Sequence, residues 1–449
     1  MFMRKQWSFV LAGLLFVSIV SFSIAQNAKE KAFSYEKIWK QVEHLDGESL
    51  PKSATKEIDK IRVHALKEKN NQQLIKTMIY QLKMNFSISD DTFFTEVDKM
   101  DNYAKNCDDK VAQSVLYSLL SELYEMYYNA HLYVINARTQ IADFTPKDRK
   151  EWTSNHFLKT MADYARMSLQ NARELQNTPV STYQELLEKG DDTSLRPTMF
   201  DLLAHRTIDF YQNQQNNIGK VIAQEEIDPS ICFAPSKEFL QHSFSENIFQ
   251  VKDNIARIYQ QLLSFHQKNN ADAFCQADID RLLTFHALFG QNKSNNDLYM
   301  SGLDDAIVTY ASNPLSLRAV YLKAEYFRNN DNKKSAYDLC VSGIQKFPHY
   351  KGIGVLRNMM AEIATPSVSA SNNELLYPKK SLEIKLKYNN VERLILRLFK
   401  VNMSVSEYEN AKQQGTIDKR NRTLVQTETF NVKKSPTFSE QDTCVFINV

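Results

Sequence analysis

The sequence predicts a mainly α-helical protein in which helical hairpins follow one another and the start of an antiparallel β-sandwich comes last. Three observations predict it. The chain has 449 residues but only 10 glycines and 11 prolines, whereas average proteins contain roughly 7% glycine and 5% proline. Apolar residues recur at helical spacing over residues 33–363, and beyond that point they alternate with polar residues. The glycine shortage argues against turn-dense β-proteins and glycine-loop nucleotide-binding domains, because both need glycine where φ is positive.

The first 25 residues have the three parts of a secretory signal peptide. Arg4 and Lys5 precede an apolar run over residues 7–22, and small residues then lead to a cleavage site between Ala25 and Gln26. An uncleaved membrane anchor is the alternative, but the run is shorter than the roughly 20 residues that a span needs. We therefore expect a periplasmic or extracellular protein without a membrane span after cleavage. The remaining 53 basic and 53 acidic residues give no basic excess to attract a nucleic acid.

The helical domain is expected over residues 26–364. Its clearest amphipathic stripe lies on one face of a single helix, and short polar joints such as residues 69–72 separate this stripe from others. We expect the helices to pack as hairpins, with aromatic side chains, including the tyrosines of residues 124–133, filling the space between them. A peptide-binding groove lined by these tyrosines is the alternative. The stripe consists of Leu116, Leu119, Leu120, Leu123 and Tyr127.

Residues 320–348 match the pattern of one tetratricopeptide unit. Small residues fall where its two helices would cross closely, and larger ones fall where side chains would fill the groove between them. One leucine position of the pattern is occupied by Lys323. Because a single unit cannot bury its own apolar face, neighbouring hairpins must pack against it. The matching positions are Ala324, Ala336 and Gly343 for the small residues, Val320, Phe327 and Cys340 for the larger ones, and Pro348 at the end.

The pattern changes after Ile363. Residues 365–374 are polar and are expected to be a linker, and residues 375–449 are expected to be an incomplete β-sandwich domain. Apolar and charged side chains alternate over residues 382–388, which predicts a half-buried strand. Asn389 and Asn390 predict a turn, residues 394–401 a second strand, residues 404–414 a short helix, and residues 424–432 and 444–449 further strands. A sandwich usually has about seven strands, so we expect the sequence to stop within this domain.

We predict no catalytic, cofactor-binding or metal-ligating residues, no cofactor and no enzymatic activity. The nine histidines show no ligand spacing. His205 lies in the apolar stripe of a predicted helix, where a hydrogen-bonded core role is favoured over catalysis. Acidic doublets at residues 90–91, 108–109, 191–192 and 304–305 are expected at the boundaries of elements, where they cap helices or lie in turns.

The five cysteines are scattered and show no metal-binding or redox spacing. We expect small buried hydrophobic residues rather than a disulfide framework, although an exported chain could oxidise them. Their odd number would leave at least one unpaired. They are Cys107, Cys232, Cys275, Cys340 and Cys444.

Several runs, taken in order, resemble the amino-terminal part of large bacterial alpha-2-macroglobulin-like proteins. They are Trp39–Ala54, Gln73–Lys76, Ser118–Tyr128 and, most specifically, Leu195–Tyr211. In that family a helical region precedes a chain of macroglobulin-like β-sandwich domains, so the resemblance implies that residues 375–449 begin such a domain. It also implies protease trapping by a bait segment and, in many members, by a thioester that carries the motif C-x-E-Q. The nearest string here, Phe438–Gln441, has phenylalanine in place of the reactive cysteine, and we treat it as a coincidence.

Two functional hypotheses follow. The first is that the chain is the amino-terminal portion of a secreted bacterial alpha-2-macroglobulin-like protease inhibitor, encoded by a truncated reading frame. In this portion the helices would dock or space partners, without a thioester or bait region. The second is a stand-alone exported tetratricopeptide-like scaffold that binds peptides or a partner protein on a helical face. We expect the partners to be proteases or other proteins or peptides.

Overall fold

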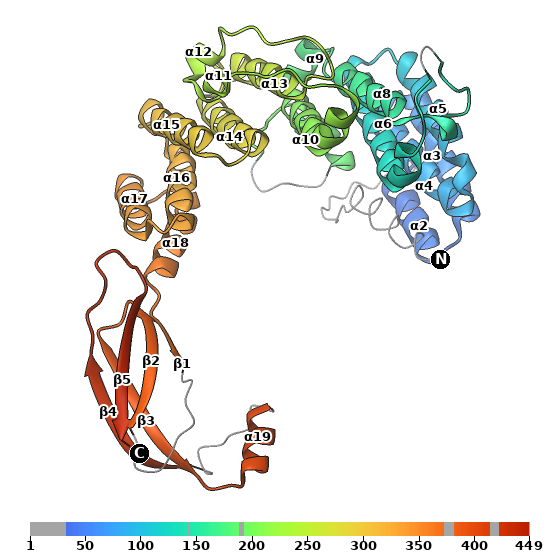
Figure 1. Cartoon of the computed structure of the whole chain (residues 1–449). Coiled ribbons are helices and arrows are strands. Elements are labelled where there is room, and N and C mark those ends of the chain that lie inside the picture. The colour runs from blue at the N-terminus through green and yellow to red at the C-terminus, as the bar shows by residue number, and fades with distance from the viewer. Residues whose placement is uncertain (1–32, 142–143, 188–192, 372–380, 414–421, 449) are drawn as a thin grey trace, which may run out of the picture. The chain divides into compact units, whose positions relative to one another are not determined.

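The computed structural model of this protein describes residues 33–141, 144–187, 193–371, 381–413 and 422–448 (Figure 1). The expected signal peptide and its cleavage site at Ala25 and Gln26 lie outside these residues. The described chain is mainly helical and ends in small antiparallel sheets, as the sequence predicted. No helix among the described residues is both long enough and apolar enough to cross a bilayer. The chain divides into two units, Met1–Gly302 and Leu303–Val449.

The first unit consists of helices that pack mostly on their neighbours in the chain. Helix α2 packs on α3, α3 on α4, α5 on α6 and α13 on α14, and short 3-10 turns interrupt the series. The helices are α2 (Tyr35–Gly47), α3 (Pro51–Glu68), α4 (Asn71–Ile88), α5 (Phe93–Lys105), α6 (Lys110–Ala130), α7 (Leu132–Asn136), α8 (Ser154–Met167), α9 (Ala172–Gln176), α10 (Met199–Val221), α11 (Pro229–Phe233), α12 (Ser236–Phe239), α13 (Val251–His266) and α14 (Ala271–Phe289). The division between the units falls within α15 (Lys293–Thr309).

Helix α6 carries the apolar stripe that the sequence predicted. Its first turn is capped by Asp109, whose carboxylate accepts hydrogen bonds from the main-chain N–H groups of Val111 and Ala112 at 2.9 and 3.0 Å. Leu116 and Leu120 are fully buried where α6 packs against α8 and α10. The cap and the stripe together explain why this segment is helical and which face it buries.

The tyrosines of α6 are packing residues. Tyr124 and Tyr128 are buried, and the ring centroids of Tyr127 and Phe157 lie 5.7 Å apart. Tyr133 differs because α6 ends at Ala130, so it lies in the short α7, where it is 91% exposed. The prediction that aromatic rings fill the space between helices is therefore confirmed for α6 itself.

Helix α10 lies at the centre of the first unit's packing. It has 23 residues and contacts α6, α8, α9 and α13. Its start is fixed by a capping box, in which the Thr198 side chain accepts from the Asp201 N–H and the Asp201 carboxylate accepts from the Thr198 N–H at 3.0 Å. This helix therefore begins at a defined residue and contributes to most of the interfaces around it.

The second unit begins with the hairpin that the tetratricopeptide-like pattern predicted. Helices α16 (Leu317–Asn329) and α17 (Lys333–Lys346) pack together, and α18 (Gly354–Ala364) packs on α17. Ala324, Ala336 and Cys340 are fully buried in their common core. Lys323 pairs with Asp304 and lies over the Phe327 ring, which explains how a lysine occupies an apolar position.

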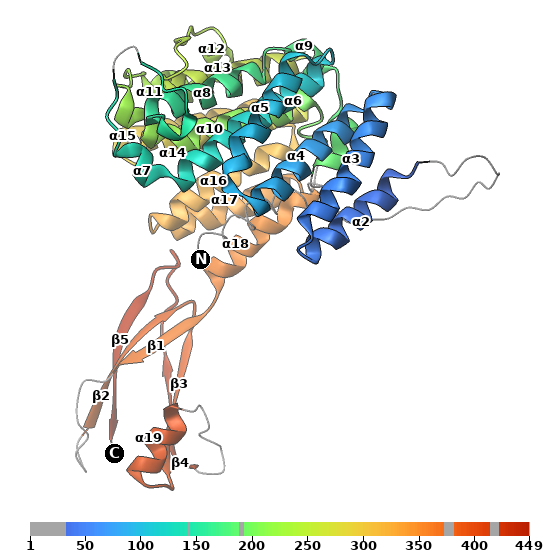
Figure 2. The ribbon, with the colours of Figure 1, turned by 90° about the vertical axis from the view of Figure 1, so that its right-hand side faces the viewer.

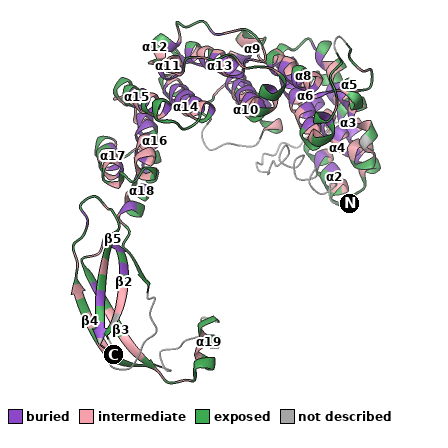
Figure 3. Cartoon of the chain, in the orientation of Figure 1, coloured by how far each residue is buried: buried purple, intermediate pink, exposed green. Residues whose placement is uncertain are grey.

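The strands of the second unit form two sheets. Strand β2 (Ser381–Asn389) pairs antiparallel with β1 (Ser367–Ser371) and β5 (Gln441–Asn448), and β3 (Arg393–Val401) pairs antiparallel with β4 (Arg422–Asn431). Helix α19 (Val405–Gln413) follows β3. The two sheets share a small core whose buried members are Leu386, Tyr388, Leu394 and Val445, and most other strand residues are exposed or half-buried (Figure 3). The strands expected from alternation are thus present, and those of β2, β3, β4 and β5 match the predicted segments within a few residues.

Three expectations differ from the structure. Residues 367–371, expected to be part of the linker, form the edge strand β1. All five residues are exposed, so the strand needs no buried apolar side chain and its sequence is mostly polar. Asp304 and Asp305 lie inside α15 rather than at an element boundary. The helices α16–α18 belong to the same unit as the strands, whereas the sequence pattern placed them with the preceding helices. These helices contact the strand region, and the change in sequence pattern at residue 364 does not reveal those contacts.

The strands follow directly after α18 (Figure 2), and two contacts join the helices α17 and α18 to the segments between the strands. The Asn390 side chain, in the turn after β2, donates hydrogen bonds to the main-chain oxygens of Ile363 and Thr365 at 2.7 and 3.1 Å, at the end of α18. Asn390 has φ of 55°, a left-handed conformation that asparagine tolerates. The ring centroids of Phe438 and of Tyr337 on α17 lie 4.7 Å apart. The turn and the loop before β5 are therefore both attached to the helical hairpin.

Replacing Gly343 with alanine is expected to destabilise the α16–α17 hairpin by about 1–3 kcal/mol, because the new methyl group overpacks the core. A Cβ atom at this position would lie 2.9 Å from Leu317 Cδ2 and 3.0 Å from Leu356 Cδ1. The measurement is amide hydrogen exchange of α16 and α17. Gly354→Ala is the control, since a Cβ atom there meets nothing within 4 Å; equal protection in the two variants would contradict the packing argument.

Candidate functional site

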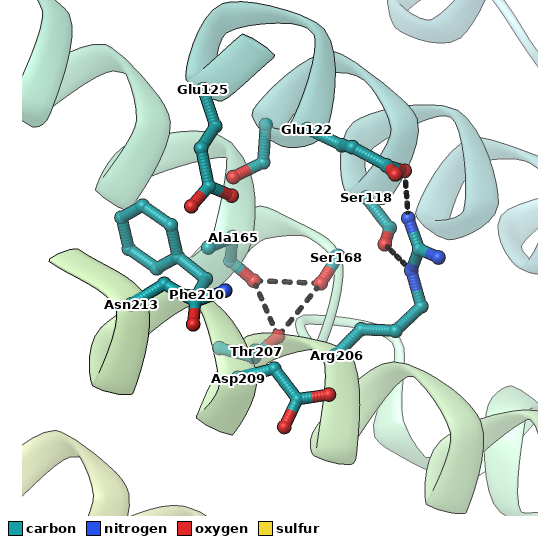
Figure 4. Close-up of a pocket in the computed structure, with 11 residues that line it drawn as sticks. Ser118, Glu122, Glu125, Ala165, Ser168, Arg206, Thr207, Asp209, Phe210 and Asn213 are labelled. Carbon is teal, nitrogen blue, oxygen red and sulfur yellow. Dashed lines mark hydrogen bonds and ion pairs between the residues drawn. The ribbon is translucent and has the colours of Figure 1, made fainter. Parts of the chain in front are cut away.

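A polar hollow of about 180 Å³ opens between helices α6, α8 and α10 (Figure 4). Its walls carry three carboxylates, one guanidinium group and several hydroxyl groups, and Phe210 and Ala165 supply apolar contacts. The charged residues are Glu122, Glu125, Asp209 and Arg206, and the hydroxyl groups belong to Ser118, Ser121, Ser168 and Thr207. The hollow is therefore suited to a polar ligand group.

The buried hydroxyl groups of the hollow are engaged with main-chain oxygens. Ser168 donates to the main-chain oxygen of Ala165 at 2.7 Å, and Thr207 donates to that of Leu203 at 2.9 Å. The Ser121 hydroxyl crosses to α8 and donates to the Met161 oxygen at 2.9 Å. These bonds satisfy the hydroxyl protons and tie the helices together, so the serines act as structural groups and not as activated nucleophiles.

Arg206 connects the two longest walls of the hollow. Its Nε donates to the Ser118 hydroxyl at 2.9 Å, and its guanidinium group pairs with the Glu122 carboxylate. Both charged side chains are about one-third exposed, at 34% and 32%, so solvent weakens the pair and its contribution to stability is small. Its main effect is to hold α10 in a fixed position along α6.

Glu125 is the half-buried carboxylate of the hollow. Burial raises the pKa of Glu125, the hydrogen bond from Gln214 at 2.7 Å lowers it, and the negative charges of Glu122 and Asp209 raise it again. A hydrogen-bond donor or cation in the hollow would favour the charged carboxylate. The hollow can therefore bind a group that donates hydrogen bonds to the Glu125 carboxylate.

A buried pair of side chains that share a hydrogen bond lies next to this region, at the start of α10. The Asp201 and His266 side chains are 1% and 2% exposed, and Asp201 Oδ1 lies 2.6 Å from His266 Nε2. The other oxygen of Asp201 accepts from Thr198, so both carboxylate oxygens are satisfied. Neither side chain of the pair can reach a substrate, which makes it a structural element.

His205 lies half-buried on α10, in the apolar stripe that the sequence predicted, and its ring nitrogens face the protein. Its Nδ1 lies 2.8 Å from the main-chain oxygen of Asp201, one helical turn earlier, and its Nε2 is buried without a partner among the described residues. Burial lowers the pKa of His205, and the positive charge of Arg196 lowers it further. The ring is thus held neutral rather than presented to solvent as a general base.

The other candidates from the sequence are not brought together. Asp109 caps α6, Asp91 pairs with Lys150, and residues 191–192 lie outside the described residues. Four cysteines are buried as expected, whereas Cys444 on β5 is exposed. Burial raises the pKa of Cys232 and of Cys275 to about 12, so neither is a reactive thiolate at neutral pH. No group of three or more histidine, cysteine or acidic residues in the described ranges is arranged to hold a metal ion.

Neither the hollow nor the buried pair was predicted from the sequence. The spacing of Thr198 and Asp201 is a capping-box signature that would have marked the start of α10. The partner of Asp201 lies 65 residues away in the chain, and Glu125 and Arg206 also come from separate helices. Sequence spacing carries no signal for such contacts.

Comparisons with known proteins give no family for this chain. No protein-family model matches it, and a search of curated proteins finds no similar sequence.

Replacing Asp201 with alanine is expected to lower the free energy of unfolding by about 1–3 kcal/mol, because it leaves the buried His266 ring and the Thr198 N–H without their acceptor. The measurement is urea denaturation followed by circular dichroism. Asp163→Ala is the matched control: it removes a carboxylate of α8 that is 29% exposed and paired with lysine and arginine at the surface, and its expected cost is below about 1 kcal/mol. Equal losses of unfolding free energy in the two variants would contradict the conclusion that Asp201 is a buried structural acceptor.

Stability is also expected to depend on pH through His205. Its pKa in the folded protein is lowered, whereas the unfolded chain has the ordinary value of about 6.5. The unfolded chain therefore binds this proton more readily, so the contribution to stability is complete above pH 6.5 and declines as the pH falls toward the folded-state pKa.

His205→Asn is expected to flatten this decline, since asparagine can still donate to the Asp201 oxygen but does not titrate. Urea midpoints between pH 5 and pH 8 provide the measurement. His131→Asn serves as the control, because the His131 ring contacts the Tyr127 main-chain oxygen in the same way, at 2.9 Å. If both variants keep the slope of the parent chain, His205 does not contribute to it.

Proposed function

We propose that this chain is the helical docking and spacing region of an exported alpha-2-macroglobulin-like protease inhibitor, together with the start of its first β-sandwich domain. In this role it acts without a thioester or bait segment and has no chemistry of its own. Its partners are proteases or proteins that bring proteases to the inhibitor.

The segment with the most specific resemblance supports this proposal. Leu195–Tyr211 contains the start of α10, including the capping box and Arg206. These residues hold α10 against α6 and α13, so the resemblance falls on residues that maintain an interhelical arrangement and not on reacting groups. A docking region needs such a rigid arrangement more than it needs catalytic side chains.

The attachment of the β-strands to the last helices is the observation that carries the spacing role. Asn390 bonds to the end of α18, and Phe438 packs on Tyr337 of α17. A linker free of such contacts would not hold a following domain at a set distance from the hairpin.

A stand-alone exported tetratricopeptide-like scaffold is the second candidate. It is favoured by the close packing of α16 on α17, where Gly343 stands at the helix crossing as in a tetratricopeptide unit. In this case the partner would be a peptide or an unrelated protein.

The experiment that tests the proposal measures binding of the full exported chain to endopeptidases of trypsin, chymotrypsin and subtilisin type, each inactivated by replacement of its catalytic serine. We expect saturable binding to at least one, with a dissociation constant on the order of 1 μM, equivalent to about 8 kcal/mol. Hydrolysis of small peptide substrates by the active enzymes is expected to be unchanged, because a docking region does not block an active site.

Urea-unfolded chain is the control for non-specific adhesion. Failure of the folded chain to bind any of the three enzymes would contradict the docking role, and loss of small-peptide hydrolysis would indicate a direct active-site inhibitor instead. Binding of short peptides without any binding of proteases would favour the scaffold.

A further inference from the structure

A second depression in the first unit lies between helices α9, α10 and α13 and the end of α12, which are neighbours in Figure 1. Its volume is about 510 Å³, within the roughly 300–1,000 Å³ of ligand-binding pockets. It differs from the polar hollow in composition, because it combines an apolar floor with amide and guanidinium groups.

The floor of this groove is aromatic and aliphatic. Phe200 on α10 is fully buried, and its ring meets that of Phe265 on α13 edge to face, with centroids 5.9 Å apart. Leu240, just after α12, is half-buried beside them. An apolar side chain that binds here would move from water onto a preformed apolar surface. The free energy gained by this transfer is about 25 cal/mol per Å² of apolar area buried.

Three polar side chains around the floor make no hydrogen bond to the rest of the described chain, whereas a fourth, Gln260, donates to the main-chain oxygens of Phe239 and His242. Gln176 on α9 and Gln261 and Ser264 on α13 line the groove, and no hydrogen bond joins their side chains to a described residue. A glutamine amide offers one acceptor and two donors, which is the complement of a peptide unit with its own N–H and C=O. These groups are therefore matched to an extended main chain.

Arg257 supplies the one positive charge among the residues that line the groove. Its described ion-pair partner is Glu246, at 3.4 Å, and the Glu246 side chain is 87% exposed. Such a surface pair contributes little, so the planar guanidinium group can exchange this carboxylate for another and bind it through two parallel N–H donors.

We propose that this groove binds an extended peptide segment of a partner protein, with an apolar side chain on Leu240 and Phe265 and an aspartate or glutamate side chain on Arg257. This inference rests on the docking role proposed above and specifies the chemistry of the docked segment. An internal acidic side chain is favoured over a free C-terminus, because terminal carboxylates are usually held by clustered main-chain N–H groups, whereas Gln176, Phe200, Arg257, Gln261 and Phe265 all lie within helices.

The test is fluorescence polarisation with the full chain and pools of end-capped heptapeptides. In one pool a fixed phenylalanine is followed two residues later by glutamate, and in matched pools glutamine or lysine replaces the glutamate. We expect the glutamate pool to bind at least about tenfold more tightly than the glutamine pool, corresponding to 1.4 kcal/mol. Arg257→Glu is expected to abolish this preference and to make the lysine pool the tighter binder.

Arg62→Glu is the control for the change in net charge, since Arg62 lies on α3 and does not line the groove. Leu240→Asp tests the floor and is expected to weaken binding of every pool. Circular dichroism melting curves establish that each variant is folded.

Equal binding of the glutamate and glutamine pools, or equal weakening by Arg257→Glu and Arg62→Glu, would overturn the assignment. So would tighter binding of peptides that have a free C-terminus but no acidic side chain. If Arg257→Glu still binds the inactivated proteases as the parent chain does, the groove assignment is wrong and the docking role stands; if neither peptides nor proteases bind, both are wrong.

Discussion

Asp201 is the residue on which most of the first unit depends. A carboxylate that is only 1% exposed is tolerated only when it is paired and hydrogen-bonded. Asp201 meets this requirement with Thr198 at the start of its own helix and with His266 at the end of α13. Asp201 therefore determines the residue at which α10 begins, and it also positions the end of α13 against the start of α10. Any movement between these two helices would leave a buried charge without its partner.

Because α10 is held in this way, the cavities on both sides of it keep their shape. Arg206 and Thr207 form part of the polar hollow against α6 and α8, and Phe200, nearly two turns earlier, lies beneath the floor of the groove against α9 and α13. One helix thus contributes polar groups to one recognition surface and an aromatic ring to the other. Preformed sites of this kind lose less conformational entropy on binding than flexible loops do, which suits the docking role proposed above.

The second unit is held together differently. The core between its two sheets has four buried side chains, few for independent stability. The turn at Asn390 and the loop at Phe438 add contacts to the helices before it. The helical hairpin therefore acts as a base for the strands, and the position of the strands follows from it. The helices α16–α18 and the strands accordingly belong to one unit, Leu303–Val449.

The sequence by itself determined the elements. The stripe on α6 and the alternation in β2 are local patterns, and local side-chain spacing decides which face of a helix or strand is apolar. The sequence also marked the crossing residue Gly343 and the place of His205 in an apolar stripe. Only the tertiary structure decided that Asp201 meets His266, that Phe200 and Arg257 share a groove, and that the polar residues of β1 pair with β2. These contacts join residues far apart in the chain, and the free energy that selects them comes from burial and pairing across helices, which no single stretch of sequence contains.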